Sequence, residues 1–301
     1  MAVTKTNIEW TDSTWSPIRG CSRVSEGCRH CYAETVANRF KGPGQPYEGL
    51  IAHGGQWNGK VREVIQLLDQ PLHWKKPRRI FVNSMSDLFH ENVSDDFIQM
   101  IFAVMATAKQ HTFQVLTKRP ERMQNLLAGK DLRWVIDGYL KLLKAFPKLS
   151  DKAFEMKWPL PNVQLGVSVE NQATADERIP RLLKTPAAVR WVSAEPLIGS
   201  IDLSWAQCTC PSKGDASITR HLLQCPADRR PHRLWSIDWV VVGSESGRGA
   251  REASNGWFRS IRDQCKAAGV PFFMKQICDS RGRKLPFDQV PIDLQIREYP
   301  L

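Results

Sequence analysis

Three cysteines near the N-terminus are the residues of this chain most capable of chemistry. Cys21, Cys28 and Cys31 stand within eleven residues of one another. Thiolates bind soft metals such as zinc and the iron of iron–sulfur clusters. A closed structural zinc site takes four protein ligands, whereas three ligands leave a coordination position open for a substrate or cofactor. The three cysteines therefore predict a metal centre with one open position.

Zinc in a closed site is the alternative interpretation of these cysteines. It would need a fourth ligand, for which His30 and His53 are the candidates, although surface or core packing explains either histidine equally well. The cysteines, separated by six and then two residues, also need a flexible loop that can curl closely round a cluster. Gly20 and Gly27 each precede a cysteine and supply that freedom. A helix is expected to begin after Cys31.

Short apolar runs, rich in β-branched and aromatic residues, recur along the chain with helical segments between most of them. This alternation is typical of parallel βα units, and 301 residues suit one α/β barrel. We therefore predict an α/β fold with a complete or partial parallel (β/α) barrel. Its expected strands cover 80–83, 112–116, 163–167, 189–192, 239–242 and 271–274, after an earlier strand before Cys21.

Helix signals stand between these strands. Ser94 precedes an apolar stripe that extends from Phe97 to Ala108, and Pro120 suits the first turn of another helix. Further along, Trp257, Phe258, Ile261 and Cys265 share one face of a third helix, which predicts a core position for Cys265. The basic amphipathic segment 139–144 indicates either an inserted helix or a long crossover.

Polar or charged residues follow every predicted strand. The carboxyl ends of parallel barrel strands meet at one rim, and active sites are built there from several strands. Solvation explains polar strand ends in general, but the repeated pairing of Ser with a nearby Glu favours function. For Glu195 and Lys275 an ion pair between strand ends is an equally good interpretation. The side chains expected at the rim are Ser84, Ser86, Asp87, Lys118, Arg119, Ser168, Glu170, Glu195, Glu245 and Lys275.

Residues 205–236 interrupt the pattern. We predict that residues 1–204 and 237–301 form the barrel-like catalytic domain and that 205–236 is a Cys/His-rich insertion. This segment is too polar to fold on a core of its own, so a metal would stabilise it. Zn²⁺ is the favoured ion, and a second iron–sulfur cluster or an unliganded loop are the alternatives. The expected ligands are Cys208, Cys210, His221 and Cys225.

The composition bears on partners and compartment. A formal net charge of +11 favours polyanions such as nucleic acid, although a basic surface without a specific partner explains it nearly as well. Its densest runs are 75–79 and 229–233. Eight cysteines with neither a signal peptide nor an apolar run of about 18 residues predict a cytoplasmic protein with reduced thiols, away from membranes.

The wider sequence is similar to a phage- and prophage-associated family of three-cysteine-motif proteins. The cysteine loop also resembles that of the radical S-adenosylmethionine superfamily, although its first gap is six residues and the superfamily usually has three. The motifs that carry the family resemblance lie at 7–12, 83–90, 116–120, 166–171, 193–197, 243–247 and 272–276.

This resemblance implies a [4Fe–4S] cluster on the three cysteines, S-adenosylmethionine at its open iron, an electron donor for the cluster, and a radical that takes hydrogen from a substrate. The positive charge and the phage setting suggest a nucleotide or nucleic-acid base as that substrate. The alternative is a non-catalytic, zinc- or cluster-stabilised nucleic-acid-binding protein. The implied roles are ammonium binding for Ser84, Ser86 and Asp87, carboxylate binding for Lys118 or Arg119, ribose binding for Ser168 and Glu170, and substrate contact for Glu195, Glu245 and Lys275.

Overall fold

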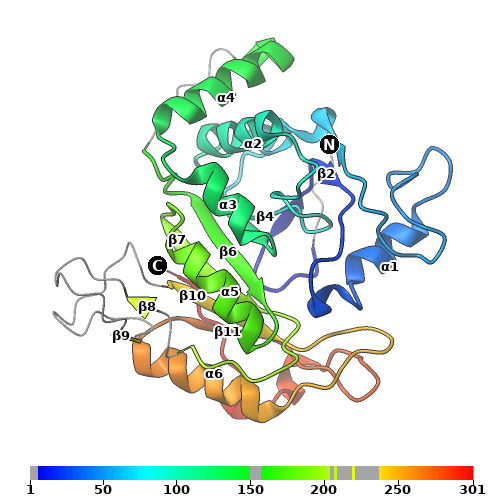
Figure 1. Cartoon of the computed structure of the whole chain (residues 1–301), viewed down its shortest axis with the longest axis vertical. Coiled ribbons are helices and arrows are strands. Elements are labelled where there is room, and N and C mark those ends of the chain that lie inside the picture. The colour runs from blue at the N-terminus through cyan, green and yellow to red at the C-terminus, as the bar shows by residue number, and fades with distance from the viewer. Residues whose placement is uncertain (1–5, 150–156, 204–206, 209–218, 221–236, 301) are drawn as a thin grey trace. The chain divides into compact units, whose positions relative to one another are not determined.

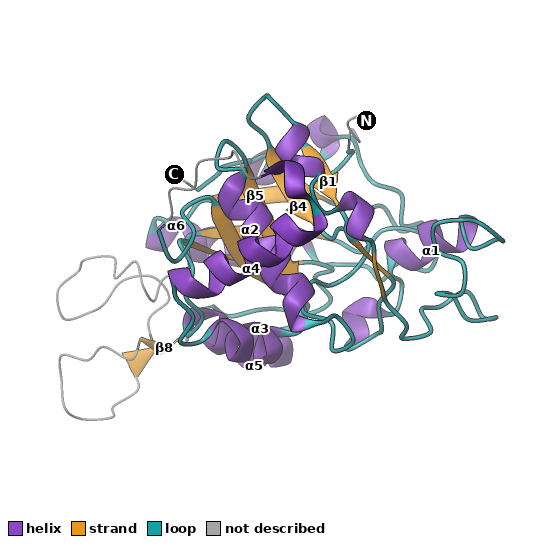
Figure 2. Ribbon diagram, turned by 90° about the horizontal axis from the view of Figure 1, so that it is seen from above, coloured by secondary structure: helices purple, strands orange, loops and turns teal. Residues whose placement is uncertain are grey.

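The apolar runs of the sequence form the strands of one sheet in the computed structural model, which describes residues 6–149, 157–203, 207–208, 219–220 and 237–300. The hydrogen-bonded order is β1-β4-β5-β6-β7-β10-β11, and Figures 1 and 2 together label these strands. The pairs β1–β4, β4–β5, β7–β10 and β10–β11 are parallel. Their bounds are β1 (Ser13–Trp15), β4 (Arg79–Val82), β5 (Thr112–Thr117), β6 (Val163–Val169), β7 (Val189–Ala194), β10 (Trp239–Gly243) and β11 (Phe272–Gln276).

The predicted fold class is confirmed in its partial form, an α/β fold with a seven-stranded parallel half-barrel. Each of the six predicted strands is present, and β1 with the short β2 (Ile18–Arg19) precedes Cys21. β2 pairs with β3 (Arg62–Glu63) in an antiparallel arrangement. All five residues of β10 are buried. Parallel strands covered on both faces are continuously apolar in this way, which is why the sequence pattern was clear.

The chain divides into two units, which are described separately below. The first comprises residues 1–24 and 31–165, and the second comprises residues 25–30 and 166–301. The three cysteines therefore belong to different units: Cys21 and Cys31 to the first, and Cys28 to the second.

The first unit contains the helices α1 (Tyr32–Arg39), α2 (Asp95–Thr107), α3 (Pro120–Leu127) and α4 (Leu132–Ala145). Ser94 caps α2 by accepting a hydrogen bond from the Phe97 amide at 3.2 Å, and Pro120 occupies the first turn of α3, as predicted. The basic segment 139–144 lies in α4, so it forms a helix of its own. α4 packs on α2, as Figures 1 and 2 show.

The second unit contains α5 (Gln172–Leu183) and α6 (Asn255–Ala268). Cys265 on α6 is buried, which confirms its predicted core position. α6 ends at Gly269, whose left-handed φ of 68° suits glycine. α5 begins at a capping box in which Asn171 and Thr174 bond each other's backbone amides. Thr in place of the usual Glu or Gln made this start harder to find in the sequence.

The 205–236 segment is described only at β8 (Gln207–Cys208) and β9 (Thr219–Arg220), which form an antiparallel pair. Of the expected ligands, Cys210, His221 and Cys225 lie outside the described residues, as does the basic run 229–233. The metal site in this insertion and its boundaries as a domain stay predictions. Among the helices of the described residues, none is long and apolar enough to span a bilayer.

The contact between α2 and α4 depends on a glycine. A Cβ atom on Gly138 would lie 2.5 Å from the backbone oxygen of Gln99, so any side chain would push the helices apart. We expect Gly138→Ala to lower the free energy of unfolding by roughly 1–3 kcal/mol through overpacking, although alanine is the better helix former. Gly256→Ala in α6 is the matched control, because its Cβ meets nothing closer than 3.4 Å. It should be neutral or stabilising by at most about 1 kcal/mol in urea denaturation. Equal effects of the two changes would contradict this account.

Candidate functional site around the cysteine loop

In the first unit, the turn after β4 places the residues that follow Val82. Asn83 has a positive φ of 59°, a conformation that asparagine tolerates better than most residues. Its amide donates to the Trp15 oxygen at 2.7 Å, and its side-chain oxygen accepts from the Ile18 amide at 3.3 Å. Ser86 donates its hydroxyl proton to the Ile18 oxygen at 2.9 Å. The turn is thus tied to the strand residues that lead into the cysteine loop.

Asp87 in this turn is buried and bonded by the chain's own donors. Its Oδ1 accepts from the Phe89 amide at 2.9 Å and the Thr117 hydroxyl at 2.8 Å. Its Oδ2 accepts from the Lys118 amide and from Arg119 Nη1, both at 3.1 Å. Four donors satisfy a carboxylate, so the geometry gives Asp87 a structural task within the first unit.

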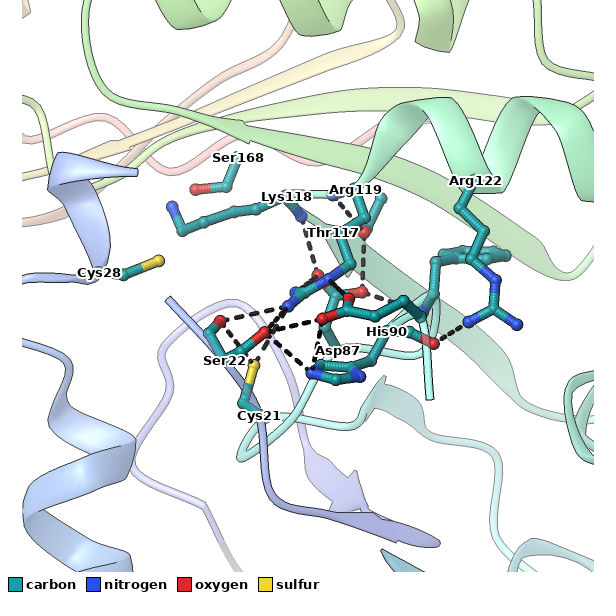
Figure 3. A network of polar contacts seen from close by, with 12 residues as sticks. Cys21, Ser22, Cys28, Asp87, His90, Thr117, Lys118, Arg119, Arg122 and Ser168 are labelled. Carbon is teal, nitrogen blue, oxygen red and sulfur yellow. Dashed lines mark hydrogen bonds and ion pairs between the residues drawn. The ribbon is translucent and has the colours of Figure 1, made fainter. Parts of the chain in front are cut away.

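Arg119 connects Asp87 to the cysteine loop, as Figure 3 shows. Its guanidinium bonds Asp87, the exposed Glu91 at 2.8 Å, the Ser22 hydroxyl at 2.6 Å and the Ser22 oxygen at 3.2 Å. The sulfur of Cys21 lies 3.9 Å from Nη1. Burial lowers the pKa of Arg119, but the charges of Asp87 and Glu91 outweigh it and hold the pKa above its usual value. A fixed cation therefore stands beside Cys21.

His90 completes this network as a neutral donor. Its Nδ1 accepts from the Asn92 amide at 3.1 Å, so Nε2 carries the proton and donates to the Ser22 hydroxyl at 3.0 Å. Burial, reinforced by the Arg119 cation, holds the pKa of His90 below its usual value. Ser22 in turn donates to Glu91 at 3.1 Å. Burial raises the pKa of Glu91, but hydrogen bonds from its own backbone and from Arg119 lower it to about 2.

Cys21 and Cys31 pack against one apolar cluster of the first unit, formed by Ala33, Ala37, Leu50 and Trp57. Both thiols are half-buried. The chain enters the loop through Gly20, which has a φ of 92°. A Cβ atom added at this position would lie 2.2 Å from the Lys60 backbone oxygen. The close neighbour of Gly20 is thus the chain's own backbone, and the predicted curl of this glycine round a metal cluster stays a prediction.

Arg23 also anchors the cysteine loop to α1. The buried Glu34 carboxylate accepts from Arg23 Nε at 3.0 Å and Nη2 at 2.6 Å, and from the Trp57 amide at 3.1 Å. A bidentate pair of this kind fixes direction as well as distance. Tyr32 donates its hydroxyl proton to the Ser84 oxygen. Sequence reasoning did not single out Glu34, because a helical glutamate is normally solvent-facing.

In the second unit, Cys28 lies in a short 3₁₀ turn, Glu26–Cys28. Ser25 donates to Glu170 Oε1 at 2.9 Å, and Arg178 Nη1 donates to the same oxygen at 3.1 Å. Glu170 and Arg178 form a buried ion pair with side-chain exposures of 1% and 3%. Arg178 also donates to the Ser168 oxygen at 2.7 Å. Glu170 thus contacts the cysteine loop, a role that its motif did not reveal.

Polar strand ends of the second unit gather around Glu195, which follows β7. Its Oε1 lies 3.0 Å from Lys275 Nζ, so the ion pair considered from the sequence is present. Oε2 accepts from the Ser193 hydroxyl at 3.0 Å, and the Glu195 backbone oxygen accepts from Ser168 at 2.8 Å. A Cβ on Gly243 would lie 2.3 Å from Oε1, so glycine leaves the room that Glu195 occupies.

Glu245, after β10, is bonded by Arg251 rather than by another strand end. Arg251 donates through Nε at 2.9 Å and Nη2 at 2.6 Å, and its amide adds a third bond at 2.9 Å. Burial raises the pKa of Glu245, but the bonds from Arg251 outweigh it and lower the pKa below its usual value. Arg251 Nη2 also donates to the Glu26 oxygen at 2.8 Å.

The structure therefore brings the expected rim residues into separate groups. In the first unit, Asp87 and Arg119 share one network, to which Ser22, His90 and Glu91 belong although sequence reasoning missed them. In the second unit, Ser168, Glu195 and Lys275 form one group, whereas Glu170 and Glu245 each bond an arginine beyond the strand end, Arg178 and Arg251. The signal for both arginines was weak, because each stands in a polar stretch of helix or loop.

The loop thiols suit an iron–sulfur cluster in their chemistry. They are only partly buried, and the Arg119 cation lies beside the Cys21 sulfur, where it would stabilise a thiolate. Among the described residues, no three His, Cys, Asp or Glu side chains converge as the ligands of one ion do. A cluster does not require such convergence, since each cysteine binds a different iron. The protein's part would be the sulfur ligands and the charges around them.

No curated protein matches the chain. Among solved structures, a spore photoproduct lyase with a cysteine-to-serine mutation is similar at 9% sequence identity and a TM-score of 0.44, with 92% of this chain and 79% of that chain covered. A family model described as "Protein of unknown function (DUF5131)" matches residues 5–286. Because this match extends over most of the 301 residues, the chain belongs to the DUF5131 family.

Proposed function

We propose that this protein is an iron–sulfur, S-adenosylmethionine-dependent radical enzyme of the phage-associated three-cysteine type that acts in the cytoplasm. Cys21, Cys28 and Cys31 would hold a [4Fe–4S] cluster. The observation that carries the proposal is the setting of two loop thiols: Cys21 and Cys31 are half-buried and pack on one apolar cluster, and the Arg119 guanidinium lies 3.9 Å from the Cys21 sulfur.

The bound cofactors would supply one-electron cleavage of the sulfonium and a carbon radical. The chain's own residues have more ordinary tasks. The apolar cluster under Cys21 and Cys31 would exclude water from one side of the two sulfurs, and Arg119 would offset the negative charge at Cys21. Asp87, Glu91 and Ser22 hold that guanidinium in place. An external electron donor is required.

Cofactor binding is proposed for the polar strand ends of each unit. Ser84 and Ser86 are half-buried beside Asp87, and their backbone oxygens and hydroxyls would bind the ammonium group. Lys118 is the proposed partner of the carboxylate, because Arg119 is already bonded to Asp87 and Glu91. In the second unit Ser168 is proposed for the ribose, and Glu195 with Lys275 for the substrate.

A nucleotide or nucleic-acid base is the proposed substrate class. The supporting observation is the formal net charge of +11, together with the exposed Lys75 and Lys76. Polyanions gain attraction and counterion release at such a surface. Strong salt dependence of binding would support this class.

The ligand assignment is tested by anaerobic reconstitution of the full chain with iron and sulfide. We expect a brown protein with iron and sulfide contents of a [4Fe–4S] cluster, and release of methionine from S-adenosylmethionine under reductant. Cys28→Ala should lose both the colour and the release, because a cluster held by two thiolates is not retained.

Cys265→Ala is the control for that experiment, since Cys265 is buried on α6 and burial raises the pKa of its thiol to about 12. It should keep both properties. Equal losses in the two variants would contradict the ligand assignment. A colourless wild-type protein with stoichiometric zinc would favour the zinc-stabilised nucleic-acid binder instead.

The charge of Arg119 gives a second test, with redox potential as its measurement. Arg119→Gln removes the cation beside Cys21 and leaves the buried Asp87 carboxylate, so the more negative, reduced cluster becomes less favourable. We expect a lower midpoint potential in a titration followed by electron paramagnetic resonance, and a smaller decrease for Arg119→Lys. Arg133→Gln, at an exposed position of α4, should leave the potential unchanged. Identical potentials in Arg119→Gln and the wild type would refute the role of this cation.

A further inference from the structure

We infer that Glu170 and Arg251 are positioning residues that hold the Cys28 segment, residues 25–30, on the second unit. This inference rests on the proposed function in that Cys28 is taken as a cluster ligand. The geometry itself does not depend on the cluster. In this geometry Glu170 and Glu245, the partner of Arg251, hold the protein's own loop. This role replaces the ribose contact that the family resemblance implied for Glu170 and the substrate contact that it implied for Glu245.

The first attachment passes through Ser25. Its hydroxyl donates to Glu170 Oε1 at 2.9 Å and lies 4.0 Å from the Cys28 sulfur. Glu170 is in turn fixed by Arg178, and both side chains are almost completely buried. A charge-assisted bond to a buried carboxylate is stronger and more directional than a bond between neutral groups. Ser25 therefore connects the buried ion pair to the residue that carries the thiol.

Close packing adds to this attachment. A Cβ atom on Gly27 would lie 2.3 Å from Glu170 Cγ and 2.5 Å from its Oε1. Gly27 is buried, and the glutamate side chain occupies the space in which a side chain at position 27 would stand. The predicted curl of Gly27 round a metal cluster stays a prediction, and the group that approaches Gly27 in the structure is Glu170.

The second attachment passes through Glu26. Arg251 Nη2 donates to the Glu26 backbone oxygen at 2.8 Å, while Glu245 holds the same guanidinium through Nε and Nη2. Bonding to Glu245 raises the pKa of Arg251 above its usual value, so the cation persists. Three consecutive residues, Ser25, Glu26 and Gly27, are therefore held by two carboxylate–guanidinium pairs.

Oε1 of Glu170 and both carboxylate oxygens of Glu245 accept these bonds. Glu170 is buried with a side-chain exposure of 1%, and Glu245 has an exposure of 3%. A ligand that replaced these donors at Glu170 Oε1 or at Glu245 would remove the bonds that hold the loop. Holding the loop is the simpler use of these groups.

Alkylation of the apo protein tests the inference without a cluster. A short anaerobic pulse of iodoacetamide on the reduced full chain, read by peptide mass spectrometry, gives a rate for Cys28. Hydrogen exchange reports the amides of residues 25–30. Ser25→Ala leaves the Glu170–Arg178 pair intact, so folding is preserved. We expect faster alkylation of Cys28 and faster exchange at 25–30, by about tenfold, as follows from losing one bond to a charged group.

Matched variants decide between positioning and general loosening. Ser25→Thr keeps the hydroxyl, and the extended backbone at Ser25 accepts a β-branched residue, so it should restore both rates. Arg251→Gln should reproduce the Ser25→Ala effect. Ser280→Ala and Glu177→Gln, at exposed positions of the same unit, should match the wild type. Wild-type rates in both Ser25→Ala and Arg251→Gln, or equal acceleration in the controls, would overturn the inference.

Reconstitution of the same proteins separates this inference from the proposed function. If the wild type takes up no cluster while Ser25→Ala still accelerates Cys28 alkylation, the proposed function fails and the positioning role stands. If the wild type takes up a cluster, a changed paramagnetic spectrum in Ser25→Ala that returns in Ser25→Thr supports positioning of the ligand.

Discussion

Carboxylate–guanidinium pairing along the cysteine loop is the constraint on which the rest of this site depends. Arg119 holds Ser22, Glu34 holds Arg23, Glu170 holds Ser25, and Arg251 holds Glu26. The residues between Cys21 and Cys31 are mostly polar, so the hydrophobic packing of these two cysteines does not by itself fix the loop. Charged side chains from the rest of each unit hold the loop residues in place instead.

Burying these charges has a physical consequence. Desolvation of an ion pair costs nearly as much as the attraction returns, so such pairs add little net stability. They do confer geometry, because removing one partner leaves a buried charge unsatisfied. Asp87 with four donors and Glu170 with Ser25 and Arg178 are arranged in this way. Their value to the protein is accordingly the position of the thiols and of the cation beside Cys21.

The parallel sheet explains why so many polar groups surround the loop. The chain turns at the end of each strand to enter the βα connection. Polar side chains in these turns form hydrogen bonds with nearby backbone groups. Asn83 shows this directly, because its positive φ and its side-chain bond to the Ile18 amide close the turn after β4. Polar strand ends thus serve the fold and the site together, and residue type alone does not separate the two uses.

The amino-acid sequence determined the local features of this protein: the buried strands, the capped helix after Ser94, the core position of Cys265, and the thiols with their adjacent glycines. These follow from periodicity and from the chemistry of neighbouring residues, which are local in the chain. Tertiary structure decided which charges meet. Glu170 pairs with Arg178 and Ser25, and Arg119 meets Asp87 and Ser22, because folding brings together residues up to 145 positions apart. A sequence pattern does not predict which of these distant residues pair, since any carboxylate could pair with any of the many basic side chains.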